Sequence, residues 1–327
     1  MSDHPPSKHC VSQPSAPLEF GPLLPLSSAA GGWRARVHQV PAATDNLCWL
    51  IEYAPQRVAL VDGPSALEVS AYLNAHQLTL THVLNTHTHG DHIGVNHALA
   101  REGSLEGVEV WASASAPIEV PGLTRALRDG EALKLGELEG FVWLTEGHLN
   151  GHISFVWGAS LERASCEEPQ GFEERPLALF CGDTLFTGGC GYVFDGPMSV
   201  MAESLCKLAS LPPSTLVCCA HEYTLDNLHF ALSLEGEALE GEALEGECPK
   251  ERAAREALKE RALEVSALRA EGKSAVPSQL GLERLTNPLL RAALRGDQGV
   301  SFERVRRLKD SRAYRQATFE ATLEALR

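Results

Sequence analysis

Short apolar runs separated by polar turns organise the first part of the chain. Three such runs, at residues 33–40, 46–52 and 58–63, contain the β-branched and aromatic side chains that strands favour. Residues 65–76 carry apolar side chains at helical spacing, and residues 80–85 form a further apolar run that predicts a buried strand. Short strands followed by a helix and another strand are typical of a sheet covered by helices.

The same pattern continues to residue 222 and then changes. The further elements predicted in this part are a short helix at residues 96–101 and strands at residues 108–111, 140–144, 153–157, 177–181 and 216–220. Residues 161–176 are polar and lack periodicity, which predicts a loop insertion. Beyond residue 222, the patterns at 249–271 and 302–327 are helical, and they predict an all-helical appendage.

These changes divide the chain into three expected parts. Residues 1–32 are rich in proline and serine and are expected to be a flexible N-terminal extension. Residues 33–222 form the predicted α/β domain, and residues 223–327 form a smaller helical domain. The helical domain contains a Leu-Glu-Gly-Glu-Ala repeat at 235–247, whose glycines weaken a helix, so a low-complexity solvated insertion is expected there.

Composition then limits the class of protein. The chain has 327 residues, of which 44% are hydrophobic and 22% charged, as in ordinary globular proteins. No apolar run approaches the ~20 residues of a membrane span, and residues 1–25 lack the pattern of a secretion signal. The nine cysteines include no CxxC pair and fit reduced thiols. We therefore expect a cytoplasmic monomer, and the formal charge of −15 argues against nucleic acid as a partner.

A cluster of histidines follows the strand predicted at 80–85. Within residues 86–92, His87 and His89 lie two apart on an extended turn and can bind one ion together. Asp91 and His92 are better placed to face a second ion alongside. A His-rich surface turn is the structural alternative, and an expression tag is excluded because the run is internal and interrupted.

Other candidate ligands also follow predicted strands, which is where α/β proteins place their sites. His148 lies in a turn after the strand at 140–144 and is expected to point into the site, whereas His152 opens the next strand and is expected to support it. Asp183 follows the strand at 177–181 and can bridge two ions with its two oxygens, or can cap the turn after it. His221 follows the strand at 216–220.

Together these residues suffice for two ions. His87, His89 and His148 with Asp183 would hold one ion. Asp91, His92 and His221 with Asp183 would hold the other, and Asp91 and Asp183 are the candidate catalytic residues. Each ion would keep a position for water, as a catalytic site requires. His97 has no partner nearby and is expected to be a surface or packing residue.

The motif at 86–92 resembles the signature of the metallo-β-lactamase superfamily. The whole pattern from residue 33 resembles glyoxalase II, the hydroxyacylglutathione hydrolases, and the landmarks that carry this resemblance are Gly147-His148, Gly182-Asp183-Thr184-Leu185-Phe186, Gly189-Cys190-Gly191 and His221-Glu222-Tyr223-Thr224. It implies a four-layer αβ/βα sandwich with a helical domain closing over a two-metal site. It also implies hydrolysis of S-D-lactoylglutathione to D-lactate and glutathione by a hydroxide that bridges two divalent ions, zinc first, with iron or manganese also compatible.

The resemblance further implies residues that bind the glutathione moiety. By position these are Tyr192, Phe194, Tyr223, Arg306 and Lys309. Tyr192 departs from the family, which usually has a basic residue there. Two other functions use the same scaffold or ligands. One is an iron-dependent persulfide dioxygenase, which needs one ion on two histidines and an aspartate, and the other is a metal-binding protein without activity.

Overall fold

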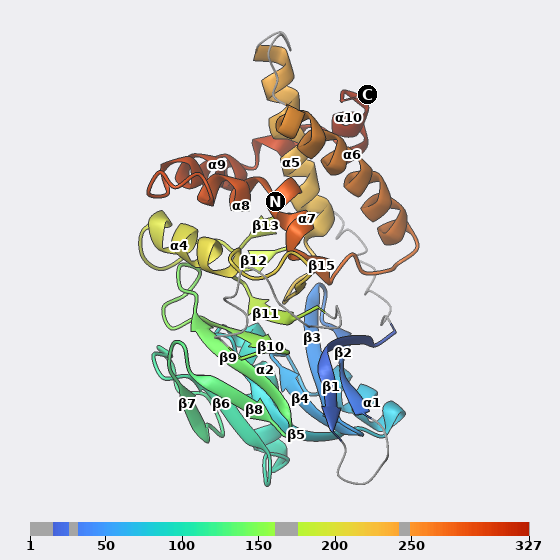
Figure 1. Cartoon of the computed structure of the whole chain (residues 1–327), viewed down its shortest axis with the longest axis vertical. Coiled ribbons are helices and arrows are strands. Elements are labelled where there is room, and N and C mark those ends of the chain that lie inside the picture. Colours follow the sequence, from blue (N-terminus) through green and yellow to red (C-terminus); the bar gives the residue numbers. More distant parts are fainter. Residues whose placement is uncertain (1–15, 26–31, 161–175, 242–248, 327) are drawn as a thin grey trace, which may run out of the picture.

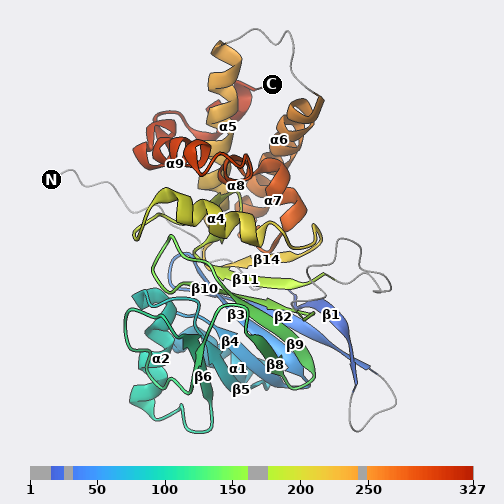
Figure 2. The same ribbon diagram turned by 60° about the vertical axis from the view of Figure 1, so that its left-hand side comes forward.

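Two sheets pack face to face in the computed structural model, which describes residues 16–25, 32–160, 176–241 and 249–326. Figures 1 and 2 show the sheets together in one half of the molecule and the helices of the C-terminal part in the other half. No helix within these described ranges combines the length and the hydropathy needed to cross a bilayer.

The first sheet has seven strands in the order β1-β2-β3-β4-β5-β6-β7. These strands are β1 (Leu18–Pro25), β2 (Gly32–Ala42), β3 (Asn46–Ala54), β4 (Arg57–Val61), β5 (Thr79–Leu84), β6 (Glu109–Ser113) and β7 (Arg125–Leu127). Strands β1 to β4 are antiparallel, and β4 to β7 are parallel to one another. The helices α1 (Leu67–His76) and α2 (Gly90–Glu102) follow β4 and β5 and cover one face of this sheet.

The second sheet has six strands in the order β15-β14-β11-β10-β9-β8. These strands are β8 (Ala132–Leu135), β9 (Leu138–Leu144), β10 (Ile153–Trp157), β11 (Ala178–Gly182), β14 (Leu216–Cys219) and β15 (Ser278–Gln279). A small hairpin of β12 (Leu185–Phe186) and β13 (Gly189–Cys190) follows β11, and helix α4 (Met198–Leu208) packs Met201 and Leu205 into the core of this sheet. The predicted four-layer sandwich is confirmed.

Strand β3 shows why the sequence specifies this layering. Successive side chains of a strand point to opposite faces. Leu47, Trp49 and Ile51 belong to the core between the two sheets, whereas Cys48 and Leu50 pack under α1 and α2. Both faces are therefore covered, and a nearly continuous apolar run is what such a central strand requires.

The C-terminal part is a group of helices, as predicted. They are α5 (Thr224–Gly241), α6 (Pro249–Ala270), α7 (Leu280–Thr286), α8 (Pro288–Ala293), α9 (Val300–Ser311), the 3-10 helix η1 (Ala313–Gln316) and α10 (Phe319–Glu324). Helices α5, α6 and α10 share a small core that includes Leu228, Leu258 and Leu323. The part is not all-helical, because its strand β15 pairs with β14 and joins the helices to the second sheet.

Four expectations about the elements and their boundaries need correction. Residues 18–25 were expected to be flexible but form β1, whose prolines are tolerated because it is an edge strand. The predicted helix at 96–101 is the end of α2, which begins at Gly90. The single helix predicted at 302–327 is interrupted at Arg312, whose backbone is left-handed with φ 56°. Residues 235–241 of the repeat continue α5, whereas 242–248 and the loop at 161–175 lie outside the described residues.

Candidate metal centre

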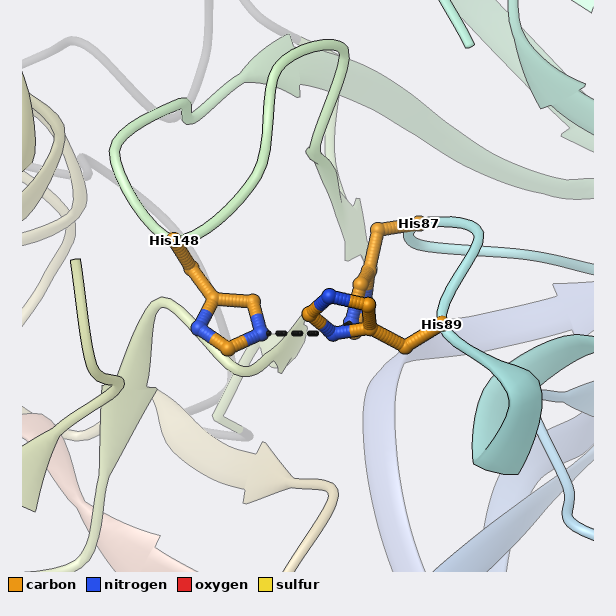
Figure 3. A group of neighbouring side chains, drawn as sticks. All are labelled: His87, His89 and His148. Atoms are coloured by element: carbon orange, nitrogen blue, oxygen red, sulfur yellow. Dashed lines mark hydrogen bonds between the residues drawn. The ribbon is translucent and has the colours of Figure 1, made fainter. Parts of the chain in front are cut away.

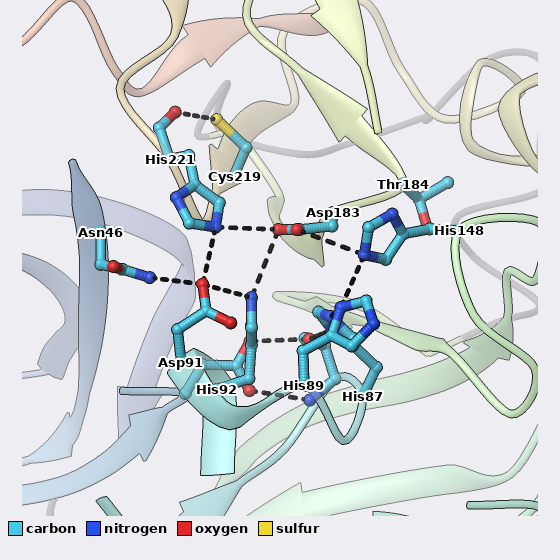
Figure 4. A network of polar contacts seen from close by, with 12 residues as sticks. Asn46, His87, His89, Asp91, His92, His148, Asp183, Thr184, Cys219 and His221 are labelled. Carbon is cyan, nitrogen blue, oxygen red and sulfur yellow. Dashed lines mark hydrogen bonds and ion pairs between the residues drawn. The ribbon is translucent and has the colours of Figure 1, made fainter. Parts of the chain in front are cut away.

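The candidate site lies where strands of both sheets end. Strands β4 and β5 are parallel and end side by side, which places Asp62 next to the loop 86–89. Strands β11 and β14 are also parallel neighbours, and they carry Asp183 and His221 at their carboxyl ends. His148 lies in the turn between β9 and β10. Figure 4 shows the side chains from these separate segments pointing toward one another.

His87, His89 and His148 form one group of candidate ligands. Nδ1 of His89 lies 3.0 Å from Nε2 of His87 and 3.0 Å from Nε2 of His148 (Figure 3). The ligand atoms of the group all lie within 4.8 Å of one another. Because metal–nitrogen bonds are ~2.0–2.1 Å long, three imidazoles at this spacing can share one ion.

Asp91, His92 and His221 form a second group. Asp91 and His92 lie in the first turn of α2 and not in the loop before it. The Oδ2 atom of Asp91 is 3.3 Å from Nε2 of His221 and 3.7 Å from Nε2 of His92. The polar atoms of this group therefore also face a common point (Figure 4).

Asp183 lies between the two groups. Its Oδ1 atom is 3.5 Å from Nε2 of His92 and 3.5 Å from Nε2 of His221. Its Oδ2 atom is 3.4 Å from Nε2 of His148. Each carboxylate oxygen thus faces a different group, which is the geometry that a bridging ligand needs. Oδ1 receives no hydrogen bond from any described residue, so this oxygen does not cap the following turn.

Two buried polar atoms without hydrogen-bond partners in the described part of the chain show whether the site suits cations. Nε2 of His92 and Oδ1 of Asp183 are buried and have no hydrogen-bond partner among the described residues. An unsatisfied buried polar atom is costly, and a cation would satisfy both of these atoms at once. Imidazole nitrogens with carboxylate oxygens are a donor set for zinc, iron or manganese. The residues present therefore fit divalent cations.

The second nitrogen of four histidines fixes how each ring is oriented. Nδ1 of His92 donates to Asp62 at 2.9 Å, and Nδ1 of His221 donates to Asp45 at 2.8 Å. Nδ1 of His148 donates to the backbone carbonyl of Tyr192 at 2.8 Å. Nδ1 of His87 lies 3.1 Å from the hydroxyl of Thr86, whose proton goes to Asp62. With the proton on Nδ1, the lone pair of Nε2 points to the centre and is free to bind a metal.

His152 supports the site, as expected, and belongs to none of the ligand groups. Its Nε2 atom accepts a hydrogen bond from the backbone N–H of Asp183 at 3.2 Å. Its Nδ1 atom lies 3.2 Å from the hydroxyl of Thr184 and 3.2 Å from that of Thr145. The ring therefore positions the backbone that carries Asp183. His97 is exposed, as expected.

Sequence reasoning missed three residues that hold the ligands. Asp62 contacts His92 and Thr86, Asp45 contacts His221, and Nδ2 of Asn46 donates to Asp91 at 3.1 Å. Asp62 directly follows a buried strand, as Asp183 does, so the rule that found Asp183 would also have found Asp62. Asp45 and Asn46 lie in a turn between β2 and β3, and no local pattern links them to the site.

The pKa values of the site follow from burial and from its four carboxylates. Burial lowers the pKa of His87 well below its usual value, so this imidazole is in the neutral form that a metal requires. Burial raises the pKa of Asp183, but His92 and His221 outweigh it and lower the pKa below its usual range. Burial lowers the pKa of His221, yet Asp183, Asp45 and Asp91 raise it to about 9. A metal ion would compete with that proton.

A pocket of about 350 Å³ opens beside the metal groups. Tyr192, Tyr223, Arg306 and Lys309 line this pocket, which is hereafter called the substrate pocket after the role proposed for it below. The ring of Tyr223 stacks on His221 with centroids 4.8 Å apart, which joins the pocket to the second metal group. The remaining expected contact, Phe194, lies 5.4 Å from the ring of His89 and 5.3 Å from that of His148, outside the pocket lining.

Comparison with known proteins places the chain in a class and then in a family. Residues 43–221 match the family model described as the metallo-beta-lactamase superfamily, and residues 222–312 match the one described as the hydroxyacylglutathione hydrolase C-terminus. A protein named hydroxyacylglutathione hydrolase from Synechococcus is 38% identical over 258 residues, which cover 78% of this chain and 88% of that protein. A protein of the same name from Nostoc is 35% identical over 284 residues, which cover 84% of this chain and 99% of that protein. The chain belongs to the hydroxyacylglutathione hydrolase family of this superfamily.

A solved structure agrees with this fold. The crystal structure of ETHE1 from Myxococcus xanthus matches with a TM-score of 0.52 and 21% sequence identity, and the match covers 85% of this chain and 91% of that one. At this identity the likeness supports the sandwich architecture alone.

Proposed function

We propose that the chain hydrolyses the thioester bond of 2-hydroxyacylglutathiones, with S-D-lactoylglutathione as the substrate in methylglyoxal detoxification. Water adds to the thioester carbonyl carbon and the carbon–sulfur bond breaks. The acyl group leaves as D-lactate, and the sulfur leaves as the thiol of glutathione. Family membership and the geometry of the site both support this proposal.

The proposed cofactor is a pair of divalent cations, with zinc preferred over iron or manganese. His87, His89 and His148 would hold one cation, and Asp91, His92 and His221 the other. Asp183 would contact both, since its two oxygens face the two groups. When bound, such a pair supplies Lewis-acid activation of water and of the thioester carbonyl.

Besides holding a cation, Asp91 is the proposed residue that orients the attacking water. Its side chain is 43% exposed, whereas that of Asp183 is 10% exposed, so Asp91 is the carboxylate that solvent and substrate reach. His221 and Asn46 lower its pKa against the effect of burial and keep it ionised. Asn46 donates to Oδ2 and fixes the orientation of the group. A thiolate is a good leaving group, so the reaction needs neither a strong acid nor a serine or cysteine nucleophile.

The observation that carries the proposal is the position of Tyr223. Its ring stacks on a candidate metal ligand, His221, and it also lines the substrate pocket, to which α9 contributes Arg306 and Lys309. If the thioester carbonyl of a substrate lies at the metal groups, the part of the substrate bonded to its sulfur would therefore lie beside Arg306 and Lys309. This arrangement suits a substrate whose leaving group carries carboxylates.

A thioester assay with metal analysis tests the proposal. The purified chain should release thiol from S-D-lactoylglutathione and should contain two divalent ions per chain by elemental analysis. A chain that holds two ions and leaves the thioester intact would refute the hydrolase function. One iron per chain with oxygen consumption on glutathione persulfide would favour the dioxygenase alternative, although the complete second group of ligands argues against it.

A further inference from the structure

Arg312 is a basic side chain of the substrate pocket with an unusual setting. The pocket is lined by four basic residues, Arg306, Lys309, Arg312 and Arg315, and by two acidic ones, Asp226 and Asp310. Four positive and two negative charges leave a net charge of +2 in a chain whose formal charge is −15. A positive pocket within a negative chain concentrates anions at that place.

The other three basic side chains are already held by the protein. Nζ of Lys309 and Nη2 of Arg315 each lie 2.8 Å from an oxygen of Asp226. Nη2 of Arg306 donates to Asp310 at 2.5 Å, and its Nη1 donates to a backbone carbonyl at 3.1 Å. Each of the two acidic groups of the pocket is thus paired with at least one of these three basic side chains.

The guanidinium of Arg312 differs, because it has no hydrogen bond or ion pair with any residue that the structure describes. Its side chain is exposed and lines the pocket. A guanidinium presents several donors in a fixed plane that matches a carboxylate. Arg312 is therefore able to bind an anion without first breaking an internal contact.

The backbone of Arg312 gives a second, independent observation. Arg312 follows the last turn of α9 in the left-handed conformation, with φ 56° and ψ 18°. Glycine is the residue that favours this position, and other residues are strained there. Neither the backbone nor packing explains an arginine at this point, and strain of this kind is a pointer to function.

We propose that Arg312 binds a carboxylate of the glutathione moiety and so contributes to the preference for glutathione thioesters. The inference rests on the proposed function. Glutathione carries one carboxylate on its glycyl residue and one on its γ-glutamyl residue, and either matches the chemistry of the guanidinium. Arg306 and Lys309 would also lie beside the glutathione moiety, as proposed above, but their donors already have partners within the protein, whereas Arg312 supplies uncommitted donors.

Replacing Arg312 with glycine tests the proposal without harming the fold. Arg312→Gly removes the guanidinium and suits the left-handed backbone, so the melting temperature should stay equal or rise. The KM for S-D-lactoylglutathione should increase about tenfold with little change in kcat, because a hydrogen bond to a charged group is lost. Arg307→Ala is the matched control, since Arg307 lies on the same helix, pairs with Glu303 and does not line the pocket. It should keep the parent KM.

Esters of the substrate identify the carboxylate. The glycyl monoethyl ester of S-D-lactoylglutathione blocks one carboxylate, and the diethyl ester blocks both. For the parent, the monoester should have a higher KM than the acid if Arg312 binds the glycyl carboxylate. Only the diester should have a higher KM if Arg312 binds the γ-glutamyl carboxylate. For Arg312→Gly, the ester that raises the KM of the parent should have the same KM as the acid, and that ester identifies the bound carboxylate. An Arg312→Gly variant with the parent KM, or with a KM raised equally for acid and esters, would overturn the inference.

A binding measurement separates this inference from the proposed function. Calorimetry with S-methylglutathione should show about tenfold weaker binding to Arg312→Gly than to the parent. Arg312-dependent binding in a chain that leaves S-D-lactoylglutathione intact would refute the hydrolase function and keep the carboxylate contact. Equal binding to both chains, with hydrolysis by both, would refute the contact alone.

Discussion

The candidate metal centre and the substrate pocket hold their charged groups in different ways. In the metal centre, the candidate ligands come from strand ends and the first turn of α2, and buried partners such as Asp62 and His152 fix them. In the pocket, the basic side chains come from α9 and the turn after it, and their acidic partners are partly exposed. The arrangement in the metal centre fixes the positions of the candidate ligand atoms. The arrangement in the pocket gives a charged surface whose shape depends on how the helices pack on the sandwich.

The largest expected effect comes from Asp183→Asn in the metal centre. The amide loses the charge that both ligand groups share, so we expect loss of at least one metal ion and a decrease in kcat/KM of about 10³-fold or more. Elemental analysis and the thioester assay measure the two effects together. Asp129→Asn is the control, because Asp129 is exposed, pairs with Lys207 and belongs to none of the ligand groups. Full metal content with full activity would contradict the bridging role.

Glu283→Gln tests how firmly the helical part is joined to the sandwich. The buried Glu283 contacts the guanidinium of Arg261 and accepts a hydrogen bond from the backbone of Gly188 at 2.8 Å. Removing its charge leaves the buried Arg261 without an opposite charge, although Thr286 and Ser278 still accept its hydrogen bonds, and this should cost about 3 kcal/mol in the free energy of unfolding. Urea unfolding measures this cost.

A double variant separates the contribution of the Arg261–Glu283 ion pair to stability from that of the surrounding packing. Arg261→Met with Glu283→Leu removes both charges and should cost less than Glu283→Gln alone, since no buried charge is left unpaired. A double variant that is less stable than the single one would show that the hydrogen bond between Glu283 and Gly188 of the hairpin matters more than the charge of Glu283.

Asp62→Asn should have a smaller effect, confined to the metal centre. The variant weakens the acceptor that holds Nδ1 of His92, and such supporting groups typically change metal affinity by about 10- to 100-fold. Competition with a chelator measures this affinity. The KM of the metal-loaded variant should stay near the parent value, because Asp62 does not line the substrate pocket. A raised KM with normal metal affinity would contradict the separation of the two regions.

The sequence predicted the two regions unequally for a physical reason. His148, Asp183 and His221 each follow an apolar strand, so a local pattern and the topology of a sheet suffice to bring them together. Arg306 and Lys309 lie on a helix whose pattern also suits a solvated face, and only the family resemblance indicated the role proposed for them. The break at Arg312 was missed because neither glycine nor proline marks it. Strand β1 was missed because its prolines suggested a mobile segment.

Asp226→Asn has the smallest expected effect. It tests the ion pairs of the substrate pocket through the pH dependence of the melting temperature. Burial raises the pKa of Asp226, but Lys309 and Arg315 lower it to about 2, which is below the value near 4 expected in the unfolded chain. The unfolded state therefore binds more protons between pH 4 and pH 2, so Asp226 stabilises the folded chain above pH 4 and loses this contribution as the pH falls through that range. Asp226→Asn lacks this titration. The difference in melting temperature between parent and variant should thus shrink from pH 5 to pH 2, and a constant difference would show that the pocket ion pairs contribute little to stability.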